Sequence, residues 1–405
     1  MSGRSPAGGR LRLAVGGLSL VGLVAVGLVT HGLIAERLGA DDLAADPTTR
    51  EVDADASAET WAWRLPAGFP EPTVPADNPM STAKVELGRR LFYDSRLSRD
   101  GSMSCATCHR QELAFTDGRA RAVGVTGEVH GHGAMSLANV AYAPHLGWDD
   151  PRVEQLEDQL TTPLFGHAPI EMGLHPRDGS IERLRTDWRL QILFDAAFPD
   201  ARGTATDAVT WHHVGQAIAA FERTLLSGDS AFDRYWHQGD EDALSNAARR
   251  GMRLFFSRRL GCSTCHGGFN LSGPVRFVGA RAREPRLLNT GLYNLDGEST
   301  YPPSAPGLVR HTGDPADRGK FRAPTLRNIA VTAPYMHDGS VATLDEVLDH
   351  YAASGRAPGP LTSPLLRGFQ LSADERSDLH AFFDALTDTT FLNDPRFGPP
   401  DRRTP

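Results

Sequence analysis

Cysteine occurs in this chain of 405 residues only within two copies of one short pattern, Cys-x-x-Cys-His. The residues of the two copies are Cys105, Cys108 and His109, and Cys262, Cys265 and His266. Two thiols three positions apart can add to the two vinyl groups of one haem, and the histidine that follows then lies under the iron as its proximal ligand. The doubled pattern predicts two covalently bound haems c and leaves no cysteine over.

Two other interpretations of the cysteines explain less of the pattern. A disulfide within each pair gives no reason for the histidine that follows both pairs. A shared zinc site needs ligands at closer spacing than the interval between Cys108 and Cys262. Covalent haem accounts for both histidines and is the interpretation carried forward.

The segments before the two motifs form an imperfect internal repeat. The stretch "LGRRLFYDSRLSRDGSMSCATCH" begins at Leu87, "RGMRLFFSRRLGCSTCH" begins at Arg250, and both contain Gly-x-x-Leu-Phe. In each copy we expect a short amphipathic helix that leads into the haem-binding turn. This arrangement is typical of the entry helix of a cytochrome c domain.

Helical periodicity recurs along the chain, whereas strand-like alternation is scarce. Val214, Ile218, Phe221 and Leu225 are spaced so that they fall on one helical face. The stretches "TLDEVLDHYAAS" and "LSADERSDLHAFFDALT" each open with a Thr or Ser N-cap candidate that is followed three positions on by an acidic residue. The sequence therefore predicts a mainly α fold with two cytochrome c-like haem domains and long structured loops.

The N-terminus has the order of an export signal. Three arginines precede an apolar run at residues 13–35, which is long enough to span a bilayer. We expect either a removed signal peptide or an uncleaved signal anchor helix, and in both cases the rest of the chain is exported to the periplasm. An uncleaved segment would anchor the protein to the inner membrane. The formal net charge of −8 argues against a nucleic-acid partner.

From about Pro72 to Leu386 the chain resembles the bacterial di-haem cytochrome c peroxidase and MauG family. The stretches that carry the resemblance include "FTDG", "SLANVAY", "WDDPRVEQLEDQLTTPL", "IEMG", "AFERTLLSGDSAFDRY" and "FRAPTLRNIAVTAPYMHDGS". Two others, "TGEVHGHGAMSLANVAY" and "PLFGHAPIEMGL", are more similar still to the branch of the methanobactin-associated MauG-like di-haem enzyme. The resemblance implies a haem peroxidase-type oxidoreductase that uses hydrogen peroxide as its oxidant.

The motifs and the resemblance together predict a domain organisation. It comprises a signal peptide or signal anchor at 1–35, a flexible acidic linker at 36–62, an N-terminal peroxidatic haem domain at 63–228, a C-terminal electron-transfer haem domain at 229–392, and a tail at 393–405.

The resemblance assigns catalytic residues around the N-terminal haem, where peroxide would react. Glu171 matches the distal acid, and a carboxylate there can take a proton from peroxide and return it to the leaving oxygen. Gln159 matches a neighbouring amide that hydrogen-bonds peroxide, and Pro163 matches a proline that limits access to the pocket. Trp148 matches a tryptophan that relays electrons between the two haems.

The resemblance also bears on the sixth ligand of the C-terminal haem iron. Peroxidases of the family place a Met fourteen residues after the histidine of a Pro-Tyr-x-His motif, which is His337 in this chain, and the corresponding residue is Tyr351. MauG-like members carry a tyrosine ligand there. A phenolate favours ferric and higher iron, whereas Met favours ferrous iron. Tyr351 is the predicted ligand of haem iron 2, with His350, Met336 and His337 as rivals.

Members of the family that need reductive activation hold a distal histidine on a mobile loop. The matching position here is near Val125 and is not a histidine, although His130 and His132 follow closely in the sequence.

The family also has a calcium site between the haems. Thr332 and Pro334 match its carbonyl donors, but Gly133 stands in place of its Asn donor. One calcium ion is therefore an open prediction.

Two enzymatic functions remain in competition. The first is a MauG-like enzyme that uses peroxide and high-valent iron to oxidise an aromatic residue, with tryptophan favoured, of an exported partner protein. The second is a cytochrome c peroxidase that reduces peroxide to water with electrons from a small cytochrome or cupredoxin. Tyr351 and the missing distal histidine favour the first function. A non-catalytic electron carrier is a third and weaker option.

Overall fold

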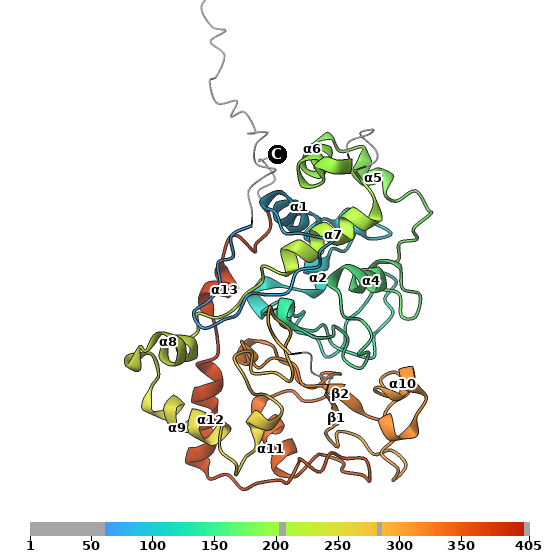
Figure 1. The fold of residues 1–405 in the computed structure, drawn as a ribbon. Coiled ribbons are helices and arrows are strands. Elements are labelled where there is room, and N and C mark those ends of the chain that lie inside the picture. The colour runs from blue at the N-terminus through green and yellow to red at the C-terminus, as the bar shows by residue number, and fades with distance from the viewer. Residues whose placement is uncertain (1–60, 202–207, 282–285, 401–405) are drawn as a thin grey trace, which may run out of the picture. The chain divides into compact units, whose positions relative to one another are not determined.

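The computed structural model describes residues 61–201, 208–281 and 286–400, and in these residues it confirms the expected helical fold (Figure 1). The longer helices are α1 (Thr82–Phe92), α6 (Trp188–Ala197), α7 (Trp211–Glu222), α8 (Ala231–Gln238), α9 (Asn246–Phe255), α11 (Leu344–Ala352) and α12 (Ala373–Asp384). The shorter helices are α2 (Cys105–Cys108), α3 (Leu156–Gln159), α4 (Thr161–Phe165), α5 (Glu182–Arg185), α10 (Val309–Thr312) and α13 (Thr389–Asn393). The regular strands of the described residues are β1 (Leu287–Asn289) and β2 (Lys320–Arg322), which pair antiparallel with Leu288 opposite Phe321.

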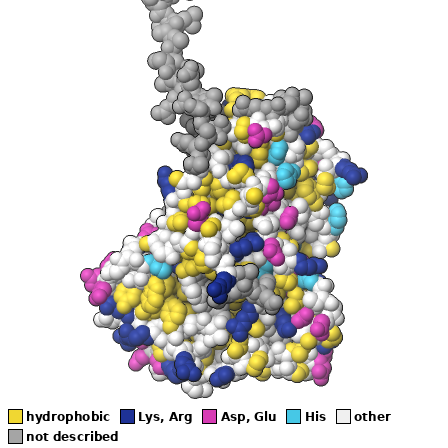
Figure 2. Space-filling view, in the orientation of Figure 1, with side chains coloured by type: hydrophobic (Ala, Val, Ile, Leu, Met, Phe, Trp, Pro, Cys, Tyr) yellow, Lys and Arg dark blue, Asp and Glu magenta, His cyan; other side chains and the backbone are white. Residues whose placement is uncertain are grey.

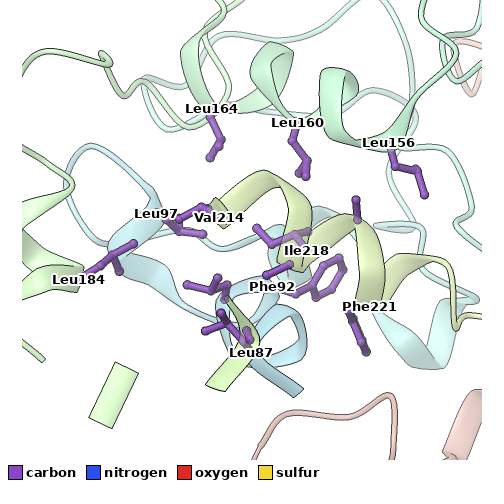
Figure 3. Packing of buried hydrophobic residues seen from close by; sticks show 14 of the residues in the cluster. Leu87, Phe92, Leu97, Leu156, Leu160, Leu164, Leu184, Val214, Ile218 and Phe221 are labelled. Carbon is purple, nitrogen blue, oxygen red and sulfur yellow. The ribbon is translucent and has the colours of Figure 1, made fainter. Parts of the chain in front are cut away.

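One hydrophobic cluster surrounds α7 in the N-terminal half. Figure 3 shows Ile218 and its neighbours on α7 between the side chains of α1 and a row of leucines from α3 and α4. The face predicted from Val214, Ile218, Phe221 and Leu225 is confirmed, because all four are fully buried. Leu225 lies just beyond the end of the helix.

The N-terminal cluster depends on a glycine at the crossing of α1 and α7. A Cβ atom on Gly88 would lie 1.9 Å from the carbonyl oxygen of Ala217 and 2.9 Å from the Cβ of Phe221. The two backbones therefore touch at this point, and an added side chain would separate the helices. The two contacted residues, Ala217 and Phe221, are four positions apart and therefore lie on one face of α7.

The C-terminal half repeats this crossing with α9 and α12, which lie side by side in Figure 1. A Cβ atom on Gly251 would lie 1.9 Å from the carbonyl oxygen of Asp378 and 2.9 Å from the Cβ of Phe382. The sequence repeat that precedes the two motifs is therefore a structural repeat of helix packing. The two predicted entry helices are confirmed as α1 and α9.

The predicted N-caps of α11 and α12 are confirmed. The Thr343 hydroxyl accepts from the amide of Glu346, whose carboxylate accepts from the amide of Thr343 in return. Ser372 and Glu375 form the same reciprocal pair at α12. Each pair supplies hydrogen-bond acceptors for two backbone N–H groups at the start of the helix, which have no acceptor within the helix itself.

Two asparagines hold the connection between the halves. Asn139 and Asn328 both adopt left-handed backbone conformations, with φ of 59° and 62°. The side-chain amide of Asn139 donates to the carbonyl of Ser227 and accepts a hydrogen bond from its backbone N–H. The side-chain amide of Asn328 donates to the Ser227 hydroxyl. All three residues are buried. These hydrogen bonds join Ser227 to one turn of each half, and the two turns share the left-handed backbone conformation of their asparagine.

The surface over α8 and α9 carries exposed aromatic rings. Trp236 and Phe256 stack with ring centroids 6.2 Å apart. Figure 2 shows hydrophobic side chains gathered on this face, beside Lys and Arg side chains.

The predicted signal segment at 1–35 and most of the linker at 36–62 lie outside the described residues. Among the helices that the structure does describe, none has the length and apolar character needed to cross a membrane.

Candidate active site

The first Cys-x-x-Cys-His motif is built on a single helical turn. Helix α2 contains both thiols, and the amide of Ser104 donates to the Thr107 hydroxyl to stabilise its start. His109 follows at once, and its Nδ1 lies 2.8 Å from the carbonyl oxygen of Phe115. A carbonyl can only accept, so Nδ1 carries the proton and Nε2 is left as the metal-binding nitrogen.

The second motif has the same design in a different local structure. Cys262 begins a 3-10 turn, and Nδ1 of His266 lies 3.1 Å from the carbonyl oxygen of Pro324. Cys262, Cys265 and His266 line a cavity of about 250 Å³. Both motifs therefore present two thiols and an imidazole whose Nδ1 faces a backbone carbonyl, which is the donor set that covalent haem requires.

All four cysteines are described, and none of them forms a disulfide. Burial raises the pKa of Cys262 to about 11. Burial, together with the Asp117 and Glu171 carboxylates, raises the pKa of Cys108 to about 11 as well.

Glu171 lies near the first motif, as the contribution of its carboxylate to the Cys108 pKa indicates. Its side chain is 32% exposed, and desolvation raises the pKa of its carboxyl to about 7. The carboxyl therefore keeps its proton to a higher pH than an ordinary glutamate does. A carboxyl in this condition can both accept and return a proton without a large energetic cost.

Backbone hydrogen bonds fix the segment that carries Glu171. Its carbonyl accepts from the amide of Val125 at 2.7 Å, and the amide of Met172 donates to the carbonyl of Pro163 at 2.9 Å. Pro163 on α4 is thus brought beside the predicted distal acid. Gln159 is the last residue of α3, one helical turn before Pro163, and no hydrogen bond links its side chain to Glu171.

Trp148 joins the two halves of the described chain. Its indole Nε1 donates to the carbonyl of Gly133 at 3.0 Å, and its own carbonyl accepts from the amide of Arg322 on β2 at 2.9 Å. Its ring lines the cavity of the second motif. The side chain is therefore held at the C-terminal cavity by a loop of the N-terminal half.

Tyr351 on α11 lines the same cavity as Cys265 and His266. Burial, with smaller contributions from the two cysteines of the second motif, raises the pKa of its phenol. A phenolate at this place needs a nearby positive charge to be stable at neutral pH.

The rivals of Tyr351 differ in position. Met336 and His337 also line the cavity, whereas His350 does not. The His350 Nδ1 instead accepts from the amide of Arg356 at 3.0 Å. The His337 ring stacks on Phe321 with centroids 3.7 Å apart.

The predicted calcium donors Thr332 and Pro334 line this cavity together with Gly133. The carbonyl of Gly133 is already the acceptor for Trp148. Within the described residues no group of three His, Cys, Asp or Glu side chains is placed to hold a metal ion. Calcium therefore stays a prediction that depends on backbone oxygens.

A buried carboxylate beside Trp148, that of Asp149, had no role in the sequence analysis. Asp149 lies between two histidines, with 3.8 Å from its Oδ2 to Nε2 of His132 and 3.4 Å from its Oδ1 to Nε2 of His311. His311 lies far along the chain from the other two residues, so the sequence offered no local signal that joins it to Asp149.

Comparison with protein families gives two matches. Residues 82–242 match the model described as di-haem cytochrome c peroxidase. Residues 320–354 match a model described as RoxA-like, cytochrome c-like. The first match contains the first motif and Glu171, and the second contains Tyr351.

Curated relatives and solved structures extend the similarity over most of the chain. Methylamine utilization protein MauG of Methylorubrum extorquens is 35% identical over 339 residues, which cover 82% of this chain and 87% of that protein. Cytochrome c551 peroxidase of Pseudomonas aeruginosa is 32% identical over 310 residues, with 76% and 80% covered. The crystal structure of a MauG-like protein associated with microbial copper homeostasis is 44% identical with a TM-score of 0.80, and 84% of this chain and 99% of that chain are covered.

Proposed function

The chain belongs to the family of di-haem cytochrome c peroxidases and MauG proteins, and from this premise we propose that it is a MauG-like enzyme. As a family member it is an oxidoreductase that uses hydrogen peroxide and carries two covalently bound haems c. In our proposal the oxidising equivalents are used on an aromatic residue, with tryptophan favoured, of an exported partner protein.

Each candidate residue has a distinct task in this proposal. When bound, the two haems supply the redox chemistry between peroxide and the partner. The Glu171 carboxylate accepts a proton from one peroxide oxygen and gives it to the leaving oxygen. Gln159 and Pro163 shape the pocket, and Trp148 provides an oxidisable ring between the two halves. These roles agree with the raised pKa of Glu171 and with the position of Trp148.

The observation that carries the MauG-like proposal is the position of Tyr351 on the cavity of the second motif. A phenol donor there stabilises oxidised iron, because a phenolate is anionic and hard. Such a site suits an enzyme whose ferric form reacts with peroxide without prior reduction of the second haem. Of its rivals, His350 is turned to the backbone of Arg356, which supports the choice of Tyr351.

The alternative is a cytochrome c peroxidase, which takes electrons from a small cytochrome or cupredoxin to reduce peroxide to water. Relatives named for each activity are similar in identity to this chain. Met336 also lines the second cavity, and a Met ligand there would favour this alternative.

Rapid mixing of the diferric protein with one equivalent of peroxide distinguishes the two functions. A MauG-like enzyme is expected to change its optical spectrum within seconds and without added reductant. An unchanged spectrum, followed by rapid turnover after one-electron reduction, would establish the peroxidase alternative instead.

Substitution at the second cavity tests the role of Tyr351 directly. Tyr351→His replaces an anionic donor by a neutral one, and the direct reaction of the diferric protein with peroxide is expected to disappear or to leave only a short-lived product. Met336→Leu is the matched control, since it changes another residue of the same cavity with little change in volume. If Met336→Leu rather than Tyr351→His alters the spectrum of the second haem, Met336 is the ligand.

The proposal also places the catalytic part of the chain in the periplasm, divided into haem domains at 63–228 and 229–392. Covalent attachment of haem to exported chains and the thiol content agree with this location. Cell fractionation tests it: the haem-bearing protein is expected outside the cytoplasm, and haem-free protein in the cytoplasm would contradict it.

A further inference from the structure

An arginine lines the cavity of the second motif. Arg322, the last residue of β2, lies on the wall of this cavity together with Cys265 and His266. Nη1 of its guanidinium donates to the carbonyl oxygen of His145 at 2.7 Å. A guanidinium carries five N–H donors, so this one backbone acceptor leaves most of its hydrogen-bonding capacity unused.

The charge of Arg322 also lacks an anion among the described residues. Burial lowers the pKa of its guanidinium to about 10, and no acidic side chain of these residues opposes that effect. A cation that leaves water for a protein interior is costly unless an anion and further hydrogen bonds compensate. The surroundings of Arg322 are therefore complete only when a negatively charged group joins them.

Two other buried arginines have the kind of partner that Arg322 lacks. Arg327 bonds Asp233 at 2.7 and 2.8 Å, and Arg223 bonds Glu157 twice at 2.7 Å. In each pair two N–H groups of a planar guanidinium meet the two oxygens of a planar carboxylate. A carboxylate is therefore the anion that fits Arg322, and the cavity is the space from which it can come.

The wall of the cavity carries an excess of positive charge. Among the described residues, four arginines line it: Arg119, Arg322, Arg327 and Arg367. Asp117 is the one aspartate or glutamate of these residues that does so, and its carboxylate accepts from the backbone amide of Arg119. A ligand that brings its own carboxylates would balance this wall.

Backbone contacts hold Arg322 between two parts of the fold. On one side its residue pairs with Leu287 of β1. On the other side its backbone N–H donates to the carbonyl of Trp148 at 2.9 Å, while its guanidinium bonds His145 in the same loop. A side chain held in this way needs little ordering when a ligand binds.

We propose that Arg322 binds a propionate carboxylate of the haem that the second motif attaches, and that it thereby joins this haem to the loop of Trp148. Haem carries two propionates in addition to the vinyl groups that the thiols take up, so the cofactor brings the missing anion with it. The interaction is an ion pair with hydrogen bonds, in which no covalent bond changes and no electron moves. It does not depend on which of the two enzymatic functions holds, because both use the second haem.

An arginine at this place has a measurable effect on the propionate. A positive charge within about 4–6 Å lowers the pKa of a carboxyl by about 1–3 units, because it stabilises the ionised form. The propionate therefore stays ionised to a lower pH with Arg322 than without it. Since its protonation removes a negative charge near the iron, the reduction potential of the haem depends on pH in the range where the propionate titrates.

Spectroelectrochemical titration of the full-length protein with both haems, at a series of pH values and without peroxide, measures this range. The signal of the second haem is identified by its change in His266→Ala. In Arg322→Gln, which keeps a polar side chain but no charge, the pH-dependent range is expected to move up by about 1–3 units. Arg322→Lys keeps the charge and is expected to move the range by less than Arg322→Gln does.

Lys320→Gln is the matched control. Lys320 lies two residues earlier on β2, pairs with Asp317 at 2.8 Å and is not among the residues that line the cavity. Its substitution removes one positive charge from the same strand and is expected to leave the range unchanged. The mass of each variant is expected to include two haems, because the thiols hold the cofactor whether or not Arg322 is present.

Three results would overturn the inference. One is an unchanged or lowered range in Arg322→Gln and also in Arg322→Met, a second neutral variant in case one of them fails to fold. Another is an equal shift in Lys320→Gln. The third is an unchanged range together with the loss of a tyrosinate absorption band in Arg322→Gln, which would make the phenolate of Tyr351 the anion.

The titration also separates this inference from the proposed function, because it needs neither peroxide nor a partner protein. A diferric protein that does not react with peroxide, but whose range moves in Arg322→Gln, removes the MauG-like proposal and supports the role of Arg322. A protein that reacts directly with peroxide, but whose range does not move, removes only the role of Arg322.

Discussion

The two halves of the molecule share a scaffold and differ in the side chain that lies near each motif. In both, a glycine lets two helix backbones touch, at Gly88 and at Gly251, and a backbone carbonyl holds Nδ1 of the motif histidine. The N-terminal half then presents a carboxyl, Glu171, whereas the C-terminal half presents a phenol, Tyr351. In our proposal the repeated part binds the cofactor, and the divergent part sets its chemistry.

The divergent residues come from loops and from α11, not from the repeated crossing. Glu171 lies on a segment that backbone hydrogen bonds join to Val125 and Pro163. In our proposal this separation lets one haem-binding unit, used twice, serve two purposes, because the helices that position the motif do not constrain the residues near it.

The largest expected effect comes from the carboxyl of the N-terminal half. Glu171→Gln keeps the shape and the hydrogen-bonding capacity but cannot move a proton, and it is expected to slow the reaction with peroxide by about 100- to 10,000-fold. Stopped-flow spectroscopy measures the rate, and haem content should not change. Glu182→Gln, an exposed residue of α5, is the control.

The second largest effect is expected on the free energy of unfolding, and it comes from a buried ion pair of the C-terminal half. In the C-terminal half Arg327 bonds Asp233 twice, at 2.7 and 2.8 Å, with both side chains fully buried. Asp233→Asn leaves the arginine without its counter-charge and is expected to lower the free energy of unfolding by about 3–5 kcal/mol.

The matching pair of the N-terminal half is more exposed. Arg223 bonds Glu157 twice at 2.7 Å, and the Glu157 side chain is 16% exposed. Glu157→Gln is therefore expected to lower the free energy of unfolding by less, about 1–3 kcal/mol. Urea unfolding followed by circular dichroism compares the two variants, and an equal or larger loss in Glu157→Gln would contradict the role given to burial.

The third effect tests the repeated crossing itself. Gly88→Ala and Gly251→Ala each place a methyl group 1.9 Å from a backbone oxygen. Because the helices are then overpacked, each substitution is expected to lower the free energy of unfolding by about 1–3 kcal/mol. Similar losses would support equivalent crossings, whereas a loss at only one position would show that the halves differ here. Gly273→Ala is the control, since a Cβ atom there meets nothing within 4 Å. Thermal unfolding of the three variants measures these losses of stability.

The smallest effect concerns the starts of the two entry helices. Ser81 caps α1 through the amide of Lys84, and Ser245 caps α9 through the amide of Ala248. Ser81→Ala and Ser245→Ala are each expected to lower the free energy of unfolding by about 1 kcal/mol, and the double variant by about the sum. A double variant that loses much more than the sum would reveal coupling between the halves.

The sequence by itself determined those features that depend on near neighbours in the chain. The Cys-x-x-Cys-His spacing predicted both haem attachment sites, and the capping pairs at Thr343 and Ser372 marked two helix starts that the structure confirms. The buried face around Ile218 followed from helical periodicity. These features were predictable because a turn of helix brings residues i, i+3 and i+4 together whatever the rest of the fold does.

Only the tertiary structure decided which distant groups meet. Glu171 faces His130 because two loops 41 positions apart exchange backbone hydrogen bonds. Asp149 lies between two histidines that enter from separate loops, and His350 turns away from the cavity that its neighbour Tyr351 lines. The sequence could not supply these contacts, because loop directions are set by long-range backbone pairing and by steric contacts such as that at Gly124, which no local periodicity encodes.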